Sequence, residues 1–403
     1  MNTWRNVTIN DLGQIITGST PPTKKTEYYG NEYPFITPTD IEIDSRIVHT
    51  ERFLSQKGYE YNKKRLLPRN AVCVTCIGSS LGKICMTTVG SVTNQQINSV
   101  VVNQQEHNPY FVYYLLKTMP NILHNVAGGV ATPIVNKTTF AKLKVCVPPL
   151  PNQRKIAAIL STYDDLIENN TRRIKILEDM AQTLYREWFV HYRFPGHENV
   201  PIVESELGPI PQGWEVKKFG EVSHNFDRLR KPLSGKVRST MQGEYPYFGA
   251  AKILDYINDY LFDGRYLLIG EDGSVVTKDG KPVLQLVTGK FWVNNHTHVV
   301  QGKYPFSTNL LYLFMSNVTI TGYITGAAQP KINQENLNRI PVIFPPKNLL
   351  ELFEETIQPN FENINAINLK NANLRQTRDL LLPKLMSGEI DVSELDIDRD
   401  NPI

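Results

Sequence analysis

The sequence predicts an α+β protein in which two duplicated mixed α/β domains are separated by a long antiparallel two-helix coiled coil. Three observations predict this architecture. A long heptad pattern occupies the middle of the chain, a similar pattern recurs near the C-terminus, and a similar order of expected strands and helices precedes each pattern. Since a single long helix cannot bury its apolar stripe alone, the second pattern supplies a partner for the first.

The first heptad pattern runs from residue 152 to residue 189. Its apolar positions are spaced alternately four and three residues apart, the period of a coiled-coil seam. The helix should be about 37 residues, or roughly 55 Å, long. Asn170 is polar and is expected to fix the register of the pairing. The expected seam positions are Ile156, Leu160, Tyr163, Ile167, Asn170, Ile174, Leu177, Ala181, Leu184 and Trp188.

The second pattern lies 197 residues further along the chain and has polar breaks. The match continues upstream, where residues 133–136 correspond to 330–333 and residues 143–149 correspond to 340–346. A period this long indicates a duplicated domain followed by a helix rather than a solenoid. The second seam is expected at Phe353, Ile357, Asn360, Ile364, Ile367, Asn371, Leu374, Arg378, Leu381 and Leu385.

Six segments follow from the duplication. A first domain should occupy 1–150, a first helix 151–193, a linker 194–213, a second domain 214–346, a second helix 347–386 and a C-terminal segment with an acidic tail 387–403. The linker is expected from its many prolines and glycines. A chain of 403 residues is long enough for two or three domains, each with its own core.

Charge and composition narrow the class of protein. The net charge is only +3, but residues 1–150 hold 15 Lys and Arg against 9 Asp and Glu, whereas residues 347–403 hold 6 against 11. A basic domain is compatible with nucleic acid. The sequence has no secretion signal and no run of 18 apolar residues, so a cytoplasmic protein without membrane contact is expected. The four cysteines fit a reducing compartment.

Four motifs in order carry a resemblance over the whole chain. They are the segment 148–156, Trp188-Phe189 followed by 194–196, the segment 206–214, and the segment 381–390. On a duplicated layout these motifs resemble the DNA-specificity subunit of type I restriction-modification systems. The resemblance implies two target-recognition domains, similar to the DNA-reading domain of adenine methyltransferases, that read an asymmetric bipartite DNA site.

The same resemblance implies the partners of the chain. They are double-stranded DNA, two adenine methyltransferase (modification) subunits and restriction (translocase/endonuclease) subunits. S-adenosylmethionine, ATP and magnesium are expected on these partner subunits and not on this chain. The alternative is a stand-alone DNA-binding coiled-coil protein without restriction-modification partners, which copurification from the native host would distinguish.

No catalytic residue is expected in this chain. It has no Gly-x-x-x-x-Gly-Lys-Ser/Thr loop for nucleotide binding. Asn108-Pro109-Tyr110 lacks one proline of the Asn-Pro-Pro-Tyr of adenine methyltransferases, and it fits the start of a helix better.

No metal site is expected either. Cys73 and Cys76 would point to opposite faces of a strand, which favours buried thiols over zinc ligands. His296 and His298 could share a strand face as ligands, but without a third ligand they are more readily surface or DNA-facing residues.

Loop-borne basic residues are the candidates for DNA contact, since Lys and Arg neutralise phosphates and Arg can also read base edges. For each of them a solvated surface charge is an equally good interpretation. The candidates in the first domain are Lys24, Lys25, Lys63, Lys64, Arg65 and Lys83, and those in the second are Arg228, Arg230, Lys231, Lys236 and Arg238. An aromatic cluster is interpreted as a partner-docking surface or, more simply, as an apolar cap at the end of the first helix: Tyr185, Trp188, Phe189, Tyr192 and Phe194.

Overall fold

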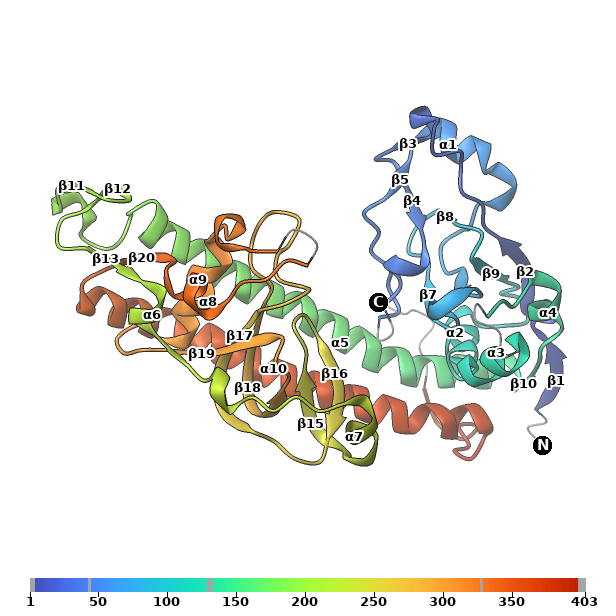
Figure 1. The fold of residues 1–403 in the computed structure, drawn as a ribbon. Helices are drawn as coiled ribbons and strands as arrows, with labels where there is room; N and C mark the ends of the chain where they lie inside the picture. The colour runs from blue at the N-terminus through green and yellow to red at the C-terminus, as the bar shows by residue number, and fades with distance from the viewer. Residues whose placement is uncertain (1–3, 43–44, 129–132, 327–328, 398–403) are drawn as a thin grey trace. The chain divides into compact units, whose positions relative to one another are not determined.

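The computed structural model describes residues 4–42, 45–128, 133–326 and 329–397 (Figure 1). The chain divides into two compact units. Unit 1 comprises residues 1–171 with 369–403, and unit 2 comprises residues 172–368. Each unit contains one mixed α/β domain and one part of each long helix. The predicted α+β class with duplicated domains and two long helices is confirmed.

The two long helices are α5 (Leu150–Tyr185) and α10 (Lys347–Ser387). A short π-helical stretch, Arg186–Val190, continues α5. α10 ends before Gly388, whose φ of 77° suits a glycine that terminates a helix.

The helix pairing is visible within unit 1. Asn170 donates a hydrogen bond of 2.8 Å to Asn371, and Arg378 donates one of 2.6 Å to Asp164. Because Asn170 follows Asp164 while Asn371 precedes Arg378, the paired segments of α5 and α10 run antiparallel.

Unit 1 contains a four-stranded antiparallel sheet covered by helix α2 (Pro109–Lys117) and helix α3 (Pro120–Ala127). In order across the sheet, the strands are β2 (Gly13–Thr17), β9 (Ile97–Val102), β6 (Val72–Thr75) and β7 (Ile84–Met86). A smaller sheet has the order β3 (Tyr29–Gly30), β5 (Phe53–Leu54), β4 (Tyr33–Ile36) and β8 (Val92–Thr93), and α1 (Gln56–Tyr61) follows β5 in the chain. The remaining elements are the pair β1 (Arg5–Thr8) with β10 (Lys144–Val147), and α4 (Lys137–Lys142).

Unit 2 contains a six-stranded sheet and the helix α8 (Thr308–Asn317). The strands in order are β14 (Ser223–Asn225), β19 (Thr297–Gly302), β17 (Phe262–Gly270), β18 (Leu284–Val293), β15 (Gln242–Phe248) and β16 (Ile253–Ile257). The other elements are the pairs β11 (Ile202–Ser205) with β12 (Gly208–Pro211) and β13 (Glu215–Lys218) with β20 (Pro341–Phe344), and the short helices α6 (Phe219–Val222), α7 (Gly235–Thr240) and α9 (Gln334–Asn338).

The duplication is preserved in the strand pairing. Tyr33-Pro34-Phe35-Ile36 forms β4, which pairs in parallel with β8, and Tyr245-Pro246-Tyr247-Phe248 forms the end of β15, which pairs in parallel with β18. Each of these strands also has an antiparallel neighbour. The two domains therefore share a local topology although their sequences have diverged.

Most expected seam residues lie in the cores of the units. At four positions the buried residue is the one after the predicted seam residue: Asp164 after Tyr163, Tyr185 after Leu184, Phe361 after Asn360 and Leu382 after Leu381. A straight α-helix has 3.6 residues per turn, so a strict 3.5-residue pattern drifts along its surface. Ile156, Leu160, Ile167, Trp188, Ile357, Ile364 and Ile367 are buried, whereas Asn170, Ile174, Leu177, Leu184, Leu374 and Leu381 are half-buried.

The segment expected to be a linker, residues 194–213, contains the β11–β12 hairpin. Phe194 and Ile210 from this segment are buried in the core of unit 2, together with Trp214. Its prolines and glycines therefore shape a packed hairpin. The aromatic cluster at the end of α5 joins the same core: Tyr185, Trp188, Phe189 and Phe194 are buried, and Tyr192 is half-buried against them. The interpretation as an apolar cap is confirmed.

Across the described ranges, no helix combines the length and the apolar character needed to cross a membrane.

Candidate nucleic-acid interface

Unit 1 has a cationic groove on the surface that carries α1. The groove has a volume of about 590 Å³ and is lined on one side by Lys63, Lys64 and Arg65, which form a single 3-10 turn after α1. Lys137, at the start of α4, and strand β2 provide further walls. Glu60 is the one acidic residue in the lining, against four cationic residues. This groove suits a polyanion such as a phosphodiester backbone.

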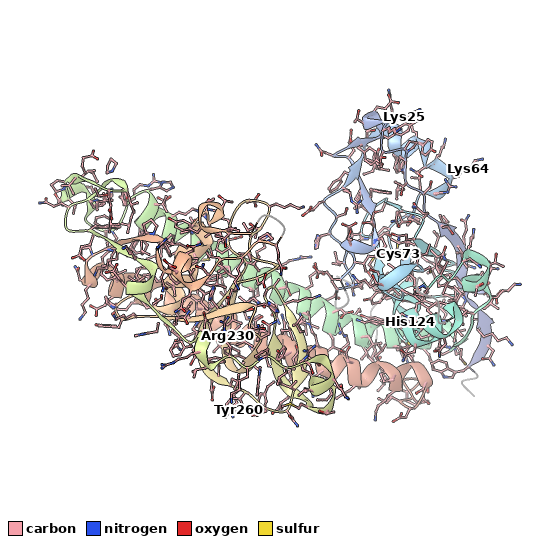
Figure 2. All side chains as sticks on the ribbon, viewed as in Figure 1. Lys25, Lys64, Cys73, His124, Arg230 and Tyr260 are labelled. Atoms are coloured by element: carbon pink, nitrogen blue, oxygen red, sulfur yellow. The ribbon has the colours of Figure 1, made fainter. Side chains whose placement is uncertain are left out.

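An aromatic stack stands at the rim of this groove. The rings of Tyr28 and Tyr61 have centroids 5.0 Å apart and an interplanar angle of 28°, and Tyr61 also lines the groove. The ammonium of Lys25 lies 5.5 Å from the centroid of the Tyr28 ring. Figure 2 shows Lys25 and Lys64 on the part of unit 1 that carries β3 and α1. Lys24, the remaining candidate in this region, is also exposed.

Lys83 differs from the other candidates in unit 1. It is half-buried, and its ammonium donates to the carbonyl of Ile41 at 2.9 Å and to that of Pro38 at 3.5 Å. Lys83 therefore holds a loop within the domain. It is not the exposed, DNA-contacting or solvated charge that the sequence predicted.

Two of the five candidates in unit 2 are likewise held by the domain itself. The guanidinium of Arg230 donates to Glu271 at 2.5 Å and to the carbonyl of Thr297 at 2.8 Å. Arg238 donates to the carbonyl of Leu233 at 2.7 Å and lies 3.2 Å from Asp255. The other three candidates, Arg228, Lys231 and Lys236, are exposed.

His298 lies in the same network as Arg230, so its expected place at the surface or facing DNA is wrong. Its side chain is 1% exposed. One ring nitrogen lies 2.5 Å from Asp227 and the other 2.9 Å from the carbonyl of Ile332. His296, in contrast, is exposed, as expected.

Three side chains of this network are close enough together to be metal ligands: Asp227, Glu271 and His298. Both ring nitrogens of His298 already face oxygen atoms, and Arg230 contacts Glu271. Burial alone would raise the pKa of Asp227, but hydrogen bonds from His298, Asn225 and the Val299 amide hold the pKa below its ordinary value. The carboxylates thus have cationic and hydrogen-bonding partners within the protein.

Unit 2 has a second cation–aromatic cluster that the sequence did not reveal. Lys290 lies 4.5 Å from the centroid of the Tyr260 ring, and Tyr245 contacts Tyr260 with a centroid distance of 5.2 Å. A hydrogen bond to Tyr260 raises the pKa of Lys290. Asp263 is the strand partner of Lys290, so the charge of this cluster is balanced.

The two cysteines of the Cys-x-x-Cys pattern are buried thiols, as predicted. Cys73 lies in β6 and accepts a hydrogen bond of 3.3 Å from Ser99. Burial raises the pKa of the Cys76 thiol to about 11. A thiol with so high a pKa is a poor metal ligand or nucleophile.

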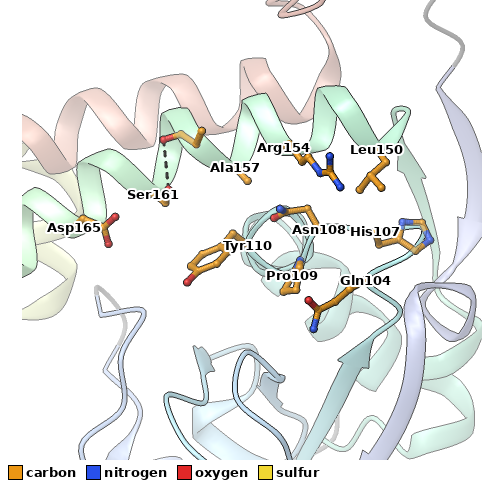
Figure 3. A pocket seen from close by; sticks show the side chains of 11 residues that line it. Gln104, His107, Asn108, Pro109, Tyr110, Leu150, Arg154, Ala157, Ser161 and Asp165 are labelled. Carbon is orange, nitrogen blue, oxygen red and sulfur yellow. Dashed lines mark hydrogen bonds between the residues drawn. The ribbon is translucent and has the colours of Figure 1, made fainter. Parts of the chain in front are cut away.

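Asn108 caps helix α2, as predicted. Its side chain accepts a hydrogen bond of 3.1 Å from the amide of Phe111. The side chain of Gln153 on α5 accepts from the amide of Asn108 at 3.0 Å, so it joins the start of α2 to the long helix. Beside this junction is a cavity of about 230 Å³ that is also lined by Tyr110, Arg154 and Asp165 (Figure 3). The Asn-Pro-Tyr segment therefore serves helix packing.

The sequence patterns did not identify Tyr28, Tyr61 and Lys137 as members of the interface. Lys137 is far from Lys63 in the sequence, and only the packing of α4 brings it to the groove. For Tyr61 a signal was present, because a tyrosine two residues before a Lys-Lys-Arg run is an aromatic residue within a basic patch.

The model of the family described as "Type I restriction modification DNA specificity domain" matches residues 1–179 and 211–370. The type I restriction enzyme MjaIX specificity subunit of Methanocaldococcus jannaschii is 29% identical over 423 aligned positions, covering 97% of this chain and 94% of that protein. The HindI specificity subunit of Haemophilus influenzae is 36% identical over 185 positions, covering 44% of this chain and 39% of that protein.

Among solved structures, the crystal structure of a type I restriction-modification S subunit from M. genitalium has a TM-score of 0.55 at 14% identity, covering 95% of this chain and 96% of that one. This likeness shows a shared fold. Since the family model matches both copies of the duplication and most of the sequence, the chain belongs to the type I restriction-modification DNA specificity family.

Proposed function

We propose that this chain is the subunit that reads an asymmetric bipartite site in double-stranded DNA and directs adenine methyltransferase and restriction subunits to it. The observation that carries the proposal is the match of the DNA specificity domain to both halves of the duplication. The cationic groove of unit 1 supports it, since four cationic side chains line a surface that suits phosphates.

The asymmetry of the site follows from the divergence of the two domains. Unit 1 divides its main strands between two four-stranded sheets, whereas unit 2 has one six-stranded sheet. The groove of unit 1 is flanked by the run Lys63–Arg65, while two of the arginines expected at the surface of unit 2 are committed to internal ion pairs. Surfaces that differ this much should read different bases, because sequence is read by side chains at base edges.

Catalysis is assigned to the partner subunits. The relatives that match this chain are named specificity subunits of restriction enzymes. In this proposal the two methyltransferase subunits bind S-adenosylmethionine, and the restriction subunits bind ATP and magnesium. The chain itself contributes the choice of site.

Copurification from the native host tests the proposed partners. A tagged full-length chain should bring down an adenine methyltransferase subunit. A chain that binds DNA but retains no methyltransferase would instead be the stand-alone DNA-binding coiled-coil protein.

A domain exchange tests the bipartite reading. Residues 1–150 are replaced by the aligned domain of a relative that matches nearly the whole chain, such as the MjaIX specificity subunit, and methylated adenines are mapped across the genome of cells that hold the complex. The exchange should alter one half of the methylated motif and leave the other half unchanged. An exchange that altered both halves would contradict separate reading by the two domains. The reciprocal exchange of 214–346 is the matched control and should alter the opposite half.

A further inference from the structure

The ring of Tyr61 in unit 1 is exposed, and packing within the domain does not explain its position. Its side chain is 50% exposed, and one ring face is covered by Tyr28. Among the described residues, its hydroxyl makes no hydrogen bond to the protein. A half-exposed ring backed by a second ring offers a flat apolar surface to whatever enters the groove.

Neighbouring tyrosines of the same region make stacking contacts and hydrogen bonds within the domain. Tyr33 stacks on Tyr59 with a centroid distance of 3.9 Å and donates a hydrogen bond to Gln56 at 2.6 Å. Tyr29 donates to the carbonyl of Pro21 at 2.8 Å. Tyr61 differs from both because it lines the groove.

The Tyr28–Tyr61 stack is held in place by close backbone packing. Helix α1 lies against the segment of Tyr28 through Gly58, where an added Cβ atom would be only 2.1 Å from the carbonyl oxygen of Tyr28. Ser55 caps α1 by accepting a hydrogen bond from the amide of Gly58, and its own amide donates to that same carbonyl at 3.1 Å. The ring of Tyr61 is therefore preorganised, which lowers the entropy lost when it contacts a ligand.

Charge identifies the kind of ligand. Lys63, Lys64, Arg65 and Lys137 share the groove with Tyr61, and Glu60 is the single opposing charge. The carboxylate of Glu60 accepts a hydrogen bond from Gln56 at 2.9 Å. Cationic side chains interleaved with an exposed aromatic ring are the combination that proteins use to bind the backbone and the nucleosides of a nucleic acid together.

Resting on the function proposed above, we propose that this groove binds the phosphates of one DNA strand and that Tyr61 packs its ring against a nucleoside of the same strand. The lysines and Arg65 supply the ionic part of the affinity. Tyr61 supplies a non-ionic part at the base or sugar. The two parts respond differently to salt, so they can be measured separately.

The experiment measures binding of the full-length chain to duplexes of about 30 base pairs, which span two half-sites roughly one helical turn apart. The wild-type chain first selects duplexes from a random pool, and the enriched duplex is then titrated at several salt concentrations. Tyr61→Ala should weaken binding about 5-fold or more at every salt concentration, with the same salt dependence as wild type. Tyr61→Phe should bind like wild type, since it keeps the ring.

The lysine variants should show the opposite behaviour. Lys63→Gln combined with Lys64→Gln should reduce the slope of log K against log salt by roughly 0.9 for each lost phosphate contact. Tyr304→Ala is the matched control, because Tyr304 is 71% exposed but lies beside Glu351 and Glu354 in unit 2. It should leave both affinity and slope unchanged. Thermal unfolding of each variant confirms that the fold persists.

The outcomes separate this inference from the function on which it rests. A wild-type chain that enriches no sequence from the random pool, either alone or together with the subunits that copurify with it, would overturn the proposed function and this inference with it. A wild-type chain that enriches a motif, together with a Tyr61→Ala variant of unchanged affinity, would overturn the role of Tyr61 alone. A Tyr61→Ala variant with an altered salt slope would also overturn it, since the loss would then be ionic.

Discussion

The buried ion pair between Asp164 and Arg378 should be the most sensitive contact of the helix pair in unit 1. We consider the replacement Arg378→Met, which keeps the apolar stem and removes the charge. The side chains of Asp164 and Arg378 are 6% and 1% exposed. Burial alone would lower the pKa of Arg378, but interactions with Asp379 and Asp164 raise it above its ordinary value. Arg378→Met therefore leaves the Asp164 carboxylate buried, with Tyr114, at 2.5 Å, as its remaining side-chain donor among the described residues.

The size of the effect follows from that geometry. Removing one partner of a buried ion pair costs about 3 to 5 kcal/mol because the other charge stays desolvated. For a unit of roughly 200 residues, each kcal/mol shifts the midpoint of unfolding by about 2 to 4 °C. The expected loss is therefore about 6 to 20 °C for unit 1.

Hydrogen exchange of the peptide that covers α2, residues 109–117, measures this loss, because Tyr114 lies in that helix. Arg339→Met is the matched control, since the ion pair of Arg339 with Glu335 is exposed, and it should leave exchange in α2 unchanged. A loss below about 1 kcal/mol for Arg378→Met would refute the reasoning, because a surface ion pair has that magnitude.

Apolar replacement of Asp164, Arg378 and Tyr114 together should restore most of the stability that Arg378→Met loses. The equivalent positions in the other repeat are Phe361 for Asp164 and Ala181 for Arg378, each 197 residues away, and Leu313 for Tyr114, counted from the helix caps Ser307 and Asn108. Asp164→Phe with Arg378→Ala and Tyr114→Leu therefore models unit 1 on the apolar packing of unit 2. Buried ion pairs can often be replaced by apolar residues of similar volume without loss. A triple variant as unstable as Arg378→Met would show that the site cannot accept apolar packing.

Three further predictions concern single contacts. Asn371→Leu should cost about 1 to 3 kcal/mol, because it leaves the half-buried amide of Asn170 without its partner, and adding Asn170→Leu should recover the loss in urea unfolding. Asp227 has a folded pKa below its ordinary value of 3.8, so its contribution to stability is present above that value and is lost as the pH falls through the folded pKa; Asp227→Asn should make the unfolding of unit 2 less dependent on pH between about 5 and 2. Gly58→Ala should displace α1 from the backbone of Tyr28 and weaken DNA binding without changing its salt slope, whereas normal affinity would show that the Tyr28–Tyr61 stack tolerates the shift.

Much of the fold could be predicted because heptad patterns and internal repeats are local features of the sequence. The long helices begin and end close to the expected residues, since Pro151 and Gly388 act through their own backbone geometry. The position of Asp164 in the seam could not be predicted in the same way. A charged residue is buried there because Arg378, 214 residues away in sequence, and Tyr114 on α2 both donate hydrogen bonds to it.

The candidate interface was predicted in part for a related reason. A run such as Lys63–Arg65 is visible in the sequence, and its exposure follows from a turn that ends a short helix. The internal hydrogen bonds of Arg230 and Lys83 depend on carbonyls and carboxylates brought together by the tertiary fold. Basic residues in similar sequence contexts can be either exposed surface charges or donors of internal hydrogen bonds. The two kinds can be distinguished only when the positions of the hydrogen-bond acceptors are known.

The polar contacts of the helix pair also bear on how a duplicated chain keeps its two halves distinct. In unit 1 the pair at the seam is Asp164 with Arg378, whereas the equivalent positions in unit 2, Ala181 and Phe361, are apolar and buried in its core. If α5 paired in the same antiparallel register with a second copy of itself, Asp164 would face Ala181, and its buried carboxylate would lack the hydrogen-bonded cation that Arg378 supplies. A pairing of that kind carries the cost of an isolated buried charge, while the pairing of α5 with α10 does not. The ion pair thus favours the association of two different helices from one chain over the association of identical helices from two chains.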